Sequence, residues 1–417
     1  MKNSIIILLS ILVITIPVTY LIHRHKKIRA NAAHMQKLRA LQRKEKEFRY
    51  EQSAGDSVDK GYILCTPSDK SSRFAYGNIV IFDLAGHMAY KKHFNCTISD
   101  FRQWRIGNRI YYSYMTDDSG AFHYPGFSLA DGHIVILDSA LNKVREVHLI
   151  PHDDINRDRK NDIDVHDLVM LSENHFITMI NYEKKVNNIP AFLHPAHDQK
   201  VGACIIQEVV DDKVIWQWDA TRFPEFYSTS IDRNHFGDTS AQDYCHFNAI
   251  VLDPKDSNLI VSFRGLNQII KISRKTGEIL WRLGGKNSDF PLADNQVFLG
   301  QHGIVFTDNN KTLLMLDNGD EHKRFYSRIL EFRLDEKNKK VSTFSAYKIP
   351  HYFSTIQGNV SKVGQNYFIG GGYGKYMLLV DPKTDKYLFE MRINLPSYRA
   401  YLVDSLYGLE KAARGNP

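Results

Sequence analysis

Three histidines occupy the same kind of position in this sequence, at the start of a short β-rich run. They are His166, His246 and His302, and apolar or β-branched residues follow each of them. An imidazole can attack an electrophile, exchange a proton near neutral pH, or ligate a metal ion. Arg264 ends the β-rich run that follows His246, and a guanidinium stays charged at any working pH. These strand-terminal residues are where we expect the chemistry of the protein.

A lone histidine at a strand start is usually a structural residue that hydrogen-bonds its neighbours. Three histidines at equivalent positions of a repeat favour a functional role, because the repeat would bring their side chains together. The main alternative function for these histidines is metal binding. Neutral imidazole is a common metal ligand, and Asp167 and Asp243 lie close in sequence to His166 and His246. A G-x-S-x-G motif is absent, which disfavours a serine hydrolase of that type. The glycine-rich stretch 370–374 precedes no helix, so a phosphate-binding loop there is disfavoured.

The elements that must position these residues form a repeat. Six segments combine turn residues with an alternating strand, which is a hairpin signal. They cover residues 83–90, 138–144, 210–216, 274–281, 335–341 and 381–387. Six similar units closed into a ring leave only short strand edges, which favours an all-β, six-bladed β-propeller over residues 60–405. The first strand of each unit would border the central channel, so His166, His246 and His302 would converge there, with Arg264 within reach.

The N-terminal region differs from the rest in composition. Residues 4–22 are mostly apolar and long enough to span a bilayer, which predicts a transmembrane anchor. A cleaved signal peptide is the alternative, but the basic residues that follow are a poor cleavage context. Residues 23–59 are interpreted as a basic helical spacer and linker, and 406–417 as a C-terminal tail. Because positive charge follows the span, the positive-inside rule would leave the domain in the cytoplasm.

The charge and the cysteine content limit which classes of partner and which cellular compartment the sequence can indicate. The net charge is +7, and residues 23–50 hold ten Lys or Arg against two Glu, so this segment accounts for the whole surplus. The remainder is near neutral, and we expect no nucleic-acid partner. The four cysteines, Cys65, Cys96, Cys204 and Cys245, are scattered and form no C-x-x-C pair. Neither their pairing nor the redox compartment follows from their spacing.

At these residues the chain resembles the arylsulfotransferase family, whose members use an aryl sulfate instead of a nucleotide sulfate donor. The resemblance rests on His246-x-Asn248 with Arg264 eighteen residues later, and on Gln301-His302. The segments 166–167, 316–319 and 397–399 also fit. It implies a six-bladed propeller, His302 as the residue that takes the sulfuryl group covalently, and His166, His246, Asn248 and Arg264 as supporting residues. It also implies that no cofactor is needed.

We therefore expect a ping-pong sulfotransferase that moves a sulfuryl group from an aryl sulfate ester to a phenol or another hydroxyl. The alternatives are a non-catalytic propeller scaffold that binds a partner or glycan, and a metal-dependent hydrolase or lyase using the same histidines. Family members in the periplasm have cleaved signals, whereas this chain resembles an anchored protein, and no family disulfide pair is identified. We expect a single-pass membrane protein with a periplasmic domain, a cytoplasmic domain being the alternative. The oligomeric state and the physiological donor and acceptor stay open.

Overall fold

The computed structural model describes residues 48–54, 61–69, 76–117, 132–157, 162–164, 166–232, 234–238 and 240–407. It separates the chain into Met1–Arg49 and Tyr50–Pro417, and every described strand belongs to the second unit. No helix in the described part of the chain is long and apolar enough to cross a membrane. The anchor at 4–22 and most of the spacer at 23–59 lie outside the described residues, so both stay predictions, as does the localisation that depends on them.

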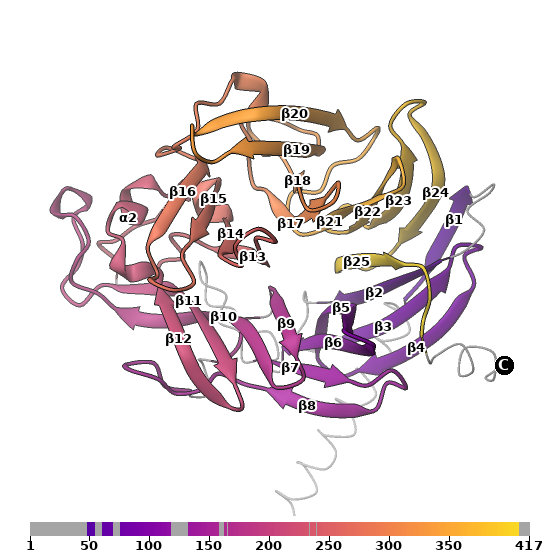
Figure 1. The fold of residues 1–417 in the computed structure, drawn as a ribbon, viewed down its shortest axis with the longest axis horizontal. Helices are drawn as coiled ribbons and strands as arrows, with labels where there is room; N and C mark the ends of the chain where they lie inside the picture. The colour runs from indigo at the N-terminus through magenta and orange to yellow at the C-terminus, as the bar shows by residue number, and fades with distance from the viewer. Residues whose placement is uncertain are drawn as a thin grey trace, which may run out of the picture. The chain divides into compact units, whose positions relative to one another are not determined.

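The described strands form six antiparallel sheets, each a blade of a propeller (Figure 1). From the inside outward, blade 1 consists of β25 (Ser397–Val403), β2 (Tyr62–Asp69), β3 (Tyr76–Asp83) and β4 (Met88–Phe94). Blade 2 consists of β5 (Thr97–Ile106), β6 (Arg109–Asp117), β7 (Gly132–Leu137) and β8 (Lys143–Val147). Blade 3 consists of β9 (Leu168–Ser172), β10 (His175–Lys185), β11 (Lys200–Val210) and β12 (Lys213–Asp219).

Blade 4 consists of β13 (Phe247–Leu252), β14 (Leu259–Phe263), β15 (Gln268–Ile272) and β16 (Ile279–Gly284). Blade 5 consists of β17 (His302–Thr307), β18 (Thr312–Asp317), β19 (Arg328–Asp335) and β20 (Lys340–Lys348). Blade 6 consists of β21 (Asn359–Val363), β22 (Asn366–Gly371), β23 (Tyr376–Asp381), β24 (Lys386–Ile393) and β1 (Tyr50–Ala54). The loops carry the short helix α2 (Glu225–Thr229) and the 3-10 turns η1 (Ala191–Leu193), η2 (Ala220–Arg222), η3 (Arg264–Leu266) and η4 (Asp294–Gln296).

The sequence prediction of a six-bladed all-β propeller is confirmed. Each of the six turn-and-strand segments is the hairpin between the third and fourth strand of its blade. In one of these hairpins the Asp381 carboxylate accepts a hydrogen bond from the Lys383 backbone N–H at 2.9 Å, a local bond that favours the turn. Apolar side chains such as Trp281, Ile304 and Leu330 fill the space between neighbouring blades. Each innermost strand contacts the innermost strand of the next blade, and the last contact, β21 with β25, completes the ring.

Both ends of the chain contribute to closing the ring. The C-terminal strand β25 is the inner strand of blade 1 and pairs with β2, for example Val403 with Tyr62. At the other end β1 pairs with β24, and Tyr50 lies opposite Ile393 (Figure 1). The sequence placed residues 50–54 within the spacer and linker at 23–59, and for these five residues that assignment is wrong, because they form a strand. Without β1, the outer edge of β24 would present unpaired backbone groups, and β1 pairs with them. The Tyr50 ring also packs 4.7 Å from that of Phe82.

Four charged residues join blades 1, 2 and 3 near the axis, and three of them, Asp100, Asp167 and Arg399, are buried. Asp167, just before β9, is 2.8 Å from Arg102 of β5 and 3.2 Å from Arg399 of β25. Asp100 of β5 is 3.4 Å from each of the two guanidiniums. The Asp167 carboxylate also accepts a hydrogen bond from the Ile250 N–H at 3.1 Å, which adds β13 of blade 4. These contacts fix the positions of four innermost strands relative to one another.

We expect Asp167→Ala to lower the free energy of unfolding by about 3–5 kcal/mol, because it leaves Arg102 and Arg399 with Asp100 as the one carboxylate that balances two guanidinium charges. Chemical denaturation followed by circular dichroism measures this loss. The matched control is Asp212→Ala, since Asp212 pairs with Arg145 but its side chain is 75% exposed. The control should lose no more than about 1 kcal/mol. Equal losses in the two variants would contradict a central role for the buried network.

Candidate active site

The structure brings together the three histidines that the sequence singled out. His166 and His246 precede the inner strands β9 and β13, and His302 is the first residue of β17. The ring centroids of His166 and His246 are 5.0 Å apart, and the planes are nearly perpendicular at 84°. The Tyr398 ring of β25 lies 5.8 Å from His166 and 5.2 Å from His302. Side chains from four blades therefore form one aromatic cluster beside the axis.

His302 is held in one tautomer and kept neutral. Its Nδ1 lies 2.6 Å from the carbonyl oxygen of Gly358, and because a carbonyl can only accept, Nδ1 carries the proton. Nε2 is then left with a free lone pair. Burial lowers the pKa of His302 well below its usual range, and the positive charge of Arg399 lowers it further. The side chain is therefore a neutral imidazole with an available nucleophilic nitrogen.

In His166 and His246, Nδ1 is instead paired with a carboxylate. Asp164 hydrogen-bonds to Nδ1 of His166, and Asp243 lies 2.5 Å from Nδ1 of His246. Burial alone would lower the pKa of His246, but the charge of Asp243 raises it above the ordinary histidine value. With Nδ1 occupied in both rings, Nε2 is the atom available for proton exchange. The histidine next to Asp243 is suited to carry a proton, whereas His302 is not.

The turn that carries His246 has an unusual backbone. His246 has φ +40°, a left-handed conformation that a non-glycine residue adopts at a cost of about 1–3 kcal/mol. The backbone N–H of Arg264 donates to the His246 carbonyl at 2.9 Å, and that of Gly265 donates to the Cys245 carbonyl at 3.0 Å. A Cβ on Gly265 would lie 2.8 Å from the Cys245 carbonyl carbon, so this approach requires glycine. Turn η3 therefore holds the turn of His246 in place.

Arg264 lies beside His246 and Asp232. Its Nη1 is 3.9 Å from an Asp232 carboxylate oxygen, and its buried Nε has no hydrogen-bond partner among the described residues. Its charge opposes protonation of His246. The charged group that acts on His302 is instead Arg399, whose own Nη1 and Nη2 contact Asp167 and the Asn248 carbonyl. Arg264 has donors to spare for a ligand, while most of those of Arg399 are already in use.

Tyr398 and Arg399 were not among the site residues that the sequence predicted, although segment 397–399 was noted as matching a family. The Tyr398 hydroxyl is buried and has no hydrogen-bond partner among the described residues. Burial raises the pKa of this phenol well above its usual range, so the hydroxyl stays protonated and can donate. Both residues come from β25, which reaches the axis through its pairing with β2. That pairing joins distant parts of the chain and leaves no local signal in the sequence.

Asn248 has a positioning contact. The register of β13 against β14 shifts between Phe247 and Ala249, which sets Asn248 apart as the bulged residue. Its amide Nδ2 donates to the Gln301 carbonyl at 2.8 Å, immediately before His302. Its Oδ1 is buried with no partner among the described residues. Asn248 therefore fixes the backbone next to His302 with one N–H and has a second N–H left.

A cluster of three carboxylates has the spacing of a metal site, and it does not include the histidines of the candidate site. Within the described ranges, one group of three His, Cys, Asp or Glu side chains has ligand atoms within 4.8 Å of one another, namely Asp253, Asp256 and Glu336, and the three histidines do not meet this condition. The Lys271 ammonium contacts these carboxylates at 2.7, 2.8 and 2.7 Å, so an internal cation already balances them.

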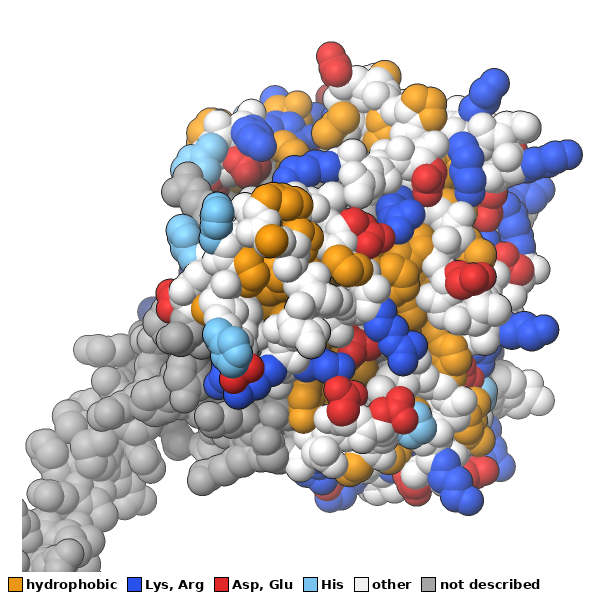
Figure 2. Space-filling view, turned by 90° about the vertical axis from the view of Figure 1, so that its left-hand side faces the viewer, with side chains coloured by type: hydrophobic (Ala, Val, Ile, Leu, Met, Phe, Trp, Pro, Cys, Tyr) orange, Lys and Arg blue, Asp and Glu red, His pale blue; other side chains and the backbone are white. Residues whose placement is uncertain are grey.

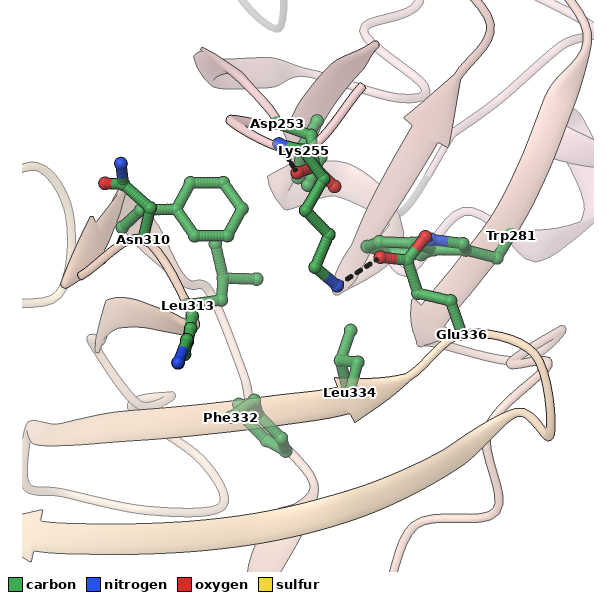
Figure 3. A pocket seen from close by; sticks show the side chains of 11 residues that line it. Asp253, Lys255, Trp281, Asn310, Leu313, Phe332, Leu334 and Glu336 are labelled. Atoms are coloured by element: carbon green, nitrogen blue, oxygen red, sulfur yellow. Dashed lines mark hydrogen bonds and ion pairs between the residues drawn. The ribbon is translucent and has the colours of Figure 1, made fainter. Parts of the chain in front are cut away.

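Two of these carboxylates, Asp253 and Glu336, border a small hollow between blades 4 and 5, where Lys255 reaches toward Glu336 beside Trp281 (Figure 3). None of the three histidines lines it.

The surface charge is mixed on the face shown in Figure 2. Lys and Arg side chains are interspersed there with Asp and Glu, and histidines gather along one edge. A nucleic-acid-binding surface would need a continuous basic stripe. The mixed pattern on this face agrees with the near-neutral composition of the chain outside residues 23–50.

Comparison with known proteins identifies one family. A family model described as Arylsulfotransferase (ASST) matches residues 78–399, which is most of the chain. No curated protein matches the chain.

Solved structures similar to the chain include a Bacteroides caccae protein of unknown function, at 10% identity and TM-score 0.47, with 83% of this chain and all of that chain covered. A Pseudomonas aeruginosa periplasmic gluconolactonase, PpgL, is 13% identical at TM-score 0.43, with 82% and 99% covered. Likenesses this distant carry no argument about function.

The two kinds of histidine environment should be visible by NMR of nitrogen-labelled histidine in the full chain. We expect the His302 ring to stay neutral at pH values at which an ordinary histidine is protonated, with its proton on Nδ1, because burial and Arg399 oppose its protonation. His246 should protonate at a pH above the ordinary histidine value, and Asp243→Asn should lower the pKa of His246. The variants His302→Asn and His246→Asn assign the signals. A His302 ring that titrates like a free histidine would contradict the assigned environment.

Proposed function

The chain belongs to the arylsulfotransferase family, and from this premise we propose that it moves a sulfuryl group from an aryl sulfate ester to a phenolic or other hydroxyl acceptor through a sulfohistidine at His302. Family membership supports sulfotransferase activity in general. The observation that carries the finer proposal is the neutral, buried His302, whose Nδ1–H is bound to Gly358 and whose Nε2 has no hydrogen-bond partner among the described residues. The other two clustered histidines have carboxylate partners suited to proton transfer.

In the first step Nε2 of His302 attacks the sulfur of the ester. An N–S bond forms, the S–O bond to the aryl group breaks, and the phenolate leaves with the bonding electrons. The His302 ring becomes a cation, and the Gly358 carbonyl, which already accepts the Nδ1–H, stabilises that charge. Covalent catalysis of this kind divides a difficult transfer into two easier ones. In the second step the acceptor oxygen attacks the same sulfur and His302 is regenerated.

The sulfuryl oxygens require fixed donors, because their charge must be stabilised while the sulfur changes partners. Three groups in the cluster have donors to spare. Arg264 has an unpartnered Nε and a guanidinium that binds tetrahedral oxyanions, and Tyr398 has a protonated hydroxyl. Asn248 has one uncommitted N–H. Arg399 adds positive charge nearby while its buried carboxylate partners hold it in place.

We assign the acid–base role to His246. Asp243 raises the pKa of His246, which favours a protonated ring that can give its proton to the leaving phenolate. The neutral ring produced in this way can then take the proton of the acceptor hydroxyl in the second step. His166, oriented by Asp164, lies beside His246 at 5.0 Å between ring centroids and is assigned to binding the transferred group. The sequence alone had left these two roles open.

We expect His302→Asn to lower kcat for transfer from a chromogenic aryl sulfate to a phenol by at least about a thousand-fold, because the nucleophile is lost. The assay follows release of coloured phenolate, and mass spectrometry of the trapped wild-type protein should show one sulfuryl group on the peptide that contains His302. The control is His197→Asn, whose side chain is 98% exposed. Unchanged turnover in His302→Asn would rule out His302 as the nucleophile. No turnover in the wild-type protein would instead favour a non-catalytic binding scaffold.

The acid role of His246 predicts a dependence on the leaving group. His246→Gln should slow transfer from unsubstituted phenyl sulfate by about 100- to 10,000-fold, since a basic phenolate needs a proton in order to leave. Transfer from nitrophenyl sulfate, whose phenolate is far less basic, should slow much less. Steady-state rates with a series of substituted phenyl sulfates measure this difference. An equal loss for every donor would argue against proton donation by His246.

A further inference from the structure

Two buried cysteines lie in direct contact behind the turn that carries His246. Cys204 is in β11 of blade 3, and Cys245 immediately precedes His246. Both residues are 0% exposed, and their sulfur atoms are 3.0 Å apart as free thiols. A disulfide bond is about 2.05 Å long, so the two sulfurs would need to approach by only about 1 Å to be joined.

The backbone, and not side-chain packing alone, sets this pair opposite each other. The segment before His246 runs parallel to β11, with an isolated bridge between Val201 and Gln242. The Gly202 N–H donates to the Gln242 carbonyl at 2.9 Å, and the Gln242 N–H donates to the Lys200 carbonyl at 3.2 Å. Moving three residues along each strand from the bridge leads to Cys204 and Cys245. The alignment of the two segments therefore places the thiols side by side.

The cysteine pair also involves both chain neighbours of His246, a residue with a left-handed backbone in the candidate site. Cys245 precedes His246, and the Phe247 N–H, on the other side, hydrogen-bonds to the sulfur of Cys204. Asp243, the carboxylate partner of His246, is two residues before Cys245. A bond between the sulfurs would thus connect β11 to the turn that holds both members of the Asp243–His246 pair.

We propose that Cys204 and Cys245 are a disulfide-forming pair that links β11 covalently to the turn of His246. The oxidant is a disulfide donor, either a small-molecule or a protein disulfide. The Cys245 thiolate attacks one sulfur of the donor, which breaks the donor's S–S bond and releases one donor thiolate. The Cys204 thiolate then attacks the Cys245 sulfur of the mixed disulfide and releases the second donor thiolate. Two electrons and two protons pass from the cysteines to the donor.

Burial determines when this exchange takes place. Burial raises the pKa of the Cys204 thiol well above its usual range, and the thiol form does not exchange. A donor also cannot reach sulfurs with no exposed surface. The bond therefore forms while the chain folds, before blades 3 and 4 pack together, and is shielded from reductants afterwards. Its presence in the isolated protein would report folding in an oxidising compartment.

The test is a thiol count on the full chain refolded either with a mixture of oxidised and reduced glutathione or with excess reductant. After oxidative refolding and removal of the glutathione, denatured protein should show two free thiols out of four, and peptide mapping should show Cys204 joined to Cys245. Refolding with reductant should leave all four free. Four free thiols after oxidative refolding, or a bond that involves Cys65 or Cys96, would overturn the proposal.

A stability measurement shows whether the bond restrains the turn. The oxidised wild-type chain should unfold at a temperature several degrees higher than the reduced chain. The double variant Cys204→Ala/Cys245→Ala should show no difference between the two conditions, and the matched control Cys65→Ala/Cys96→Ala should keep it. Equal midpoints for oxidised and reduced wild-type protein would refute the restraint. Neither readout involves sulfuryl transfer, so both are independent of the proposed function.

Discussion

The site depends on the buried charge network at the axis of the propeller. Removing a charged group from water costs several kcal/mol, and a network of this kind persists only where every charge is paired in good geometry. Here two carboxylates and two guanidiniums balance one another, and their partners come from four blades. Asp167 follows His166 in the chain, and Arg399 follows Tyr398. Fixing the network therefore also fixes the backbone of two residues of the candidate site.

The histidines of this cluster differ in their protonation because the partner of Nδ1 differs. A backbone carbonyl orients His302 without adding a negative charge, and the nearby Arg399 opposes its protonation. A carboxylate orients His246 and favours its protonation. In many enzymes, one site holds two groups with well-separated pKa values, and one acts as nucleophile while the other acts as acid or base. The separation here arises from residues that would not contact the substrate.

Much of this arrangement is visible in the sequence, because it depends on local and repeated signals. The six hairpin segments predict the blades, and equivalent strand starts predict that His166, His246 and His302 converge. The contribution of β25 could not be predicted in this way, since pairing such as Tyr62 with Val403 joins residues far apart in the chain. The contact of Asn248 with Gln301 depends on a strand bulge, and the alignment of Cys204 with Cys245 depends on an isolated bridge. Such features have no periodic signature.

The strand that closes the ring is also the last described strand to be synthesised. Blades 2 to 5 can form from contiguous sequence while the chain is still being made, but blade 1 lacks its inner strand until residues 397–403 have emerged. Tyr398 and Arg399 arrive with that strand. A polypeptide that stalls or is cut before this strand is made would thus hold most of its sheets yet lack two residues of the candidate site.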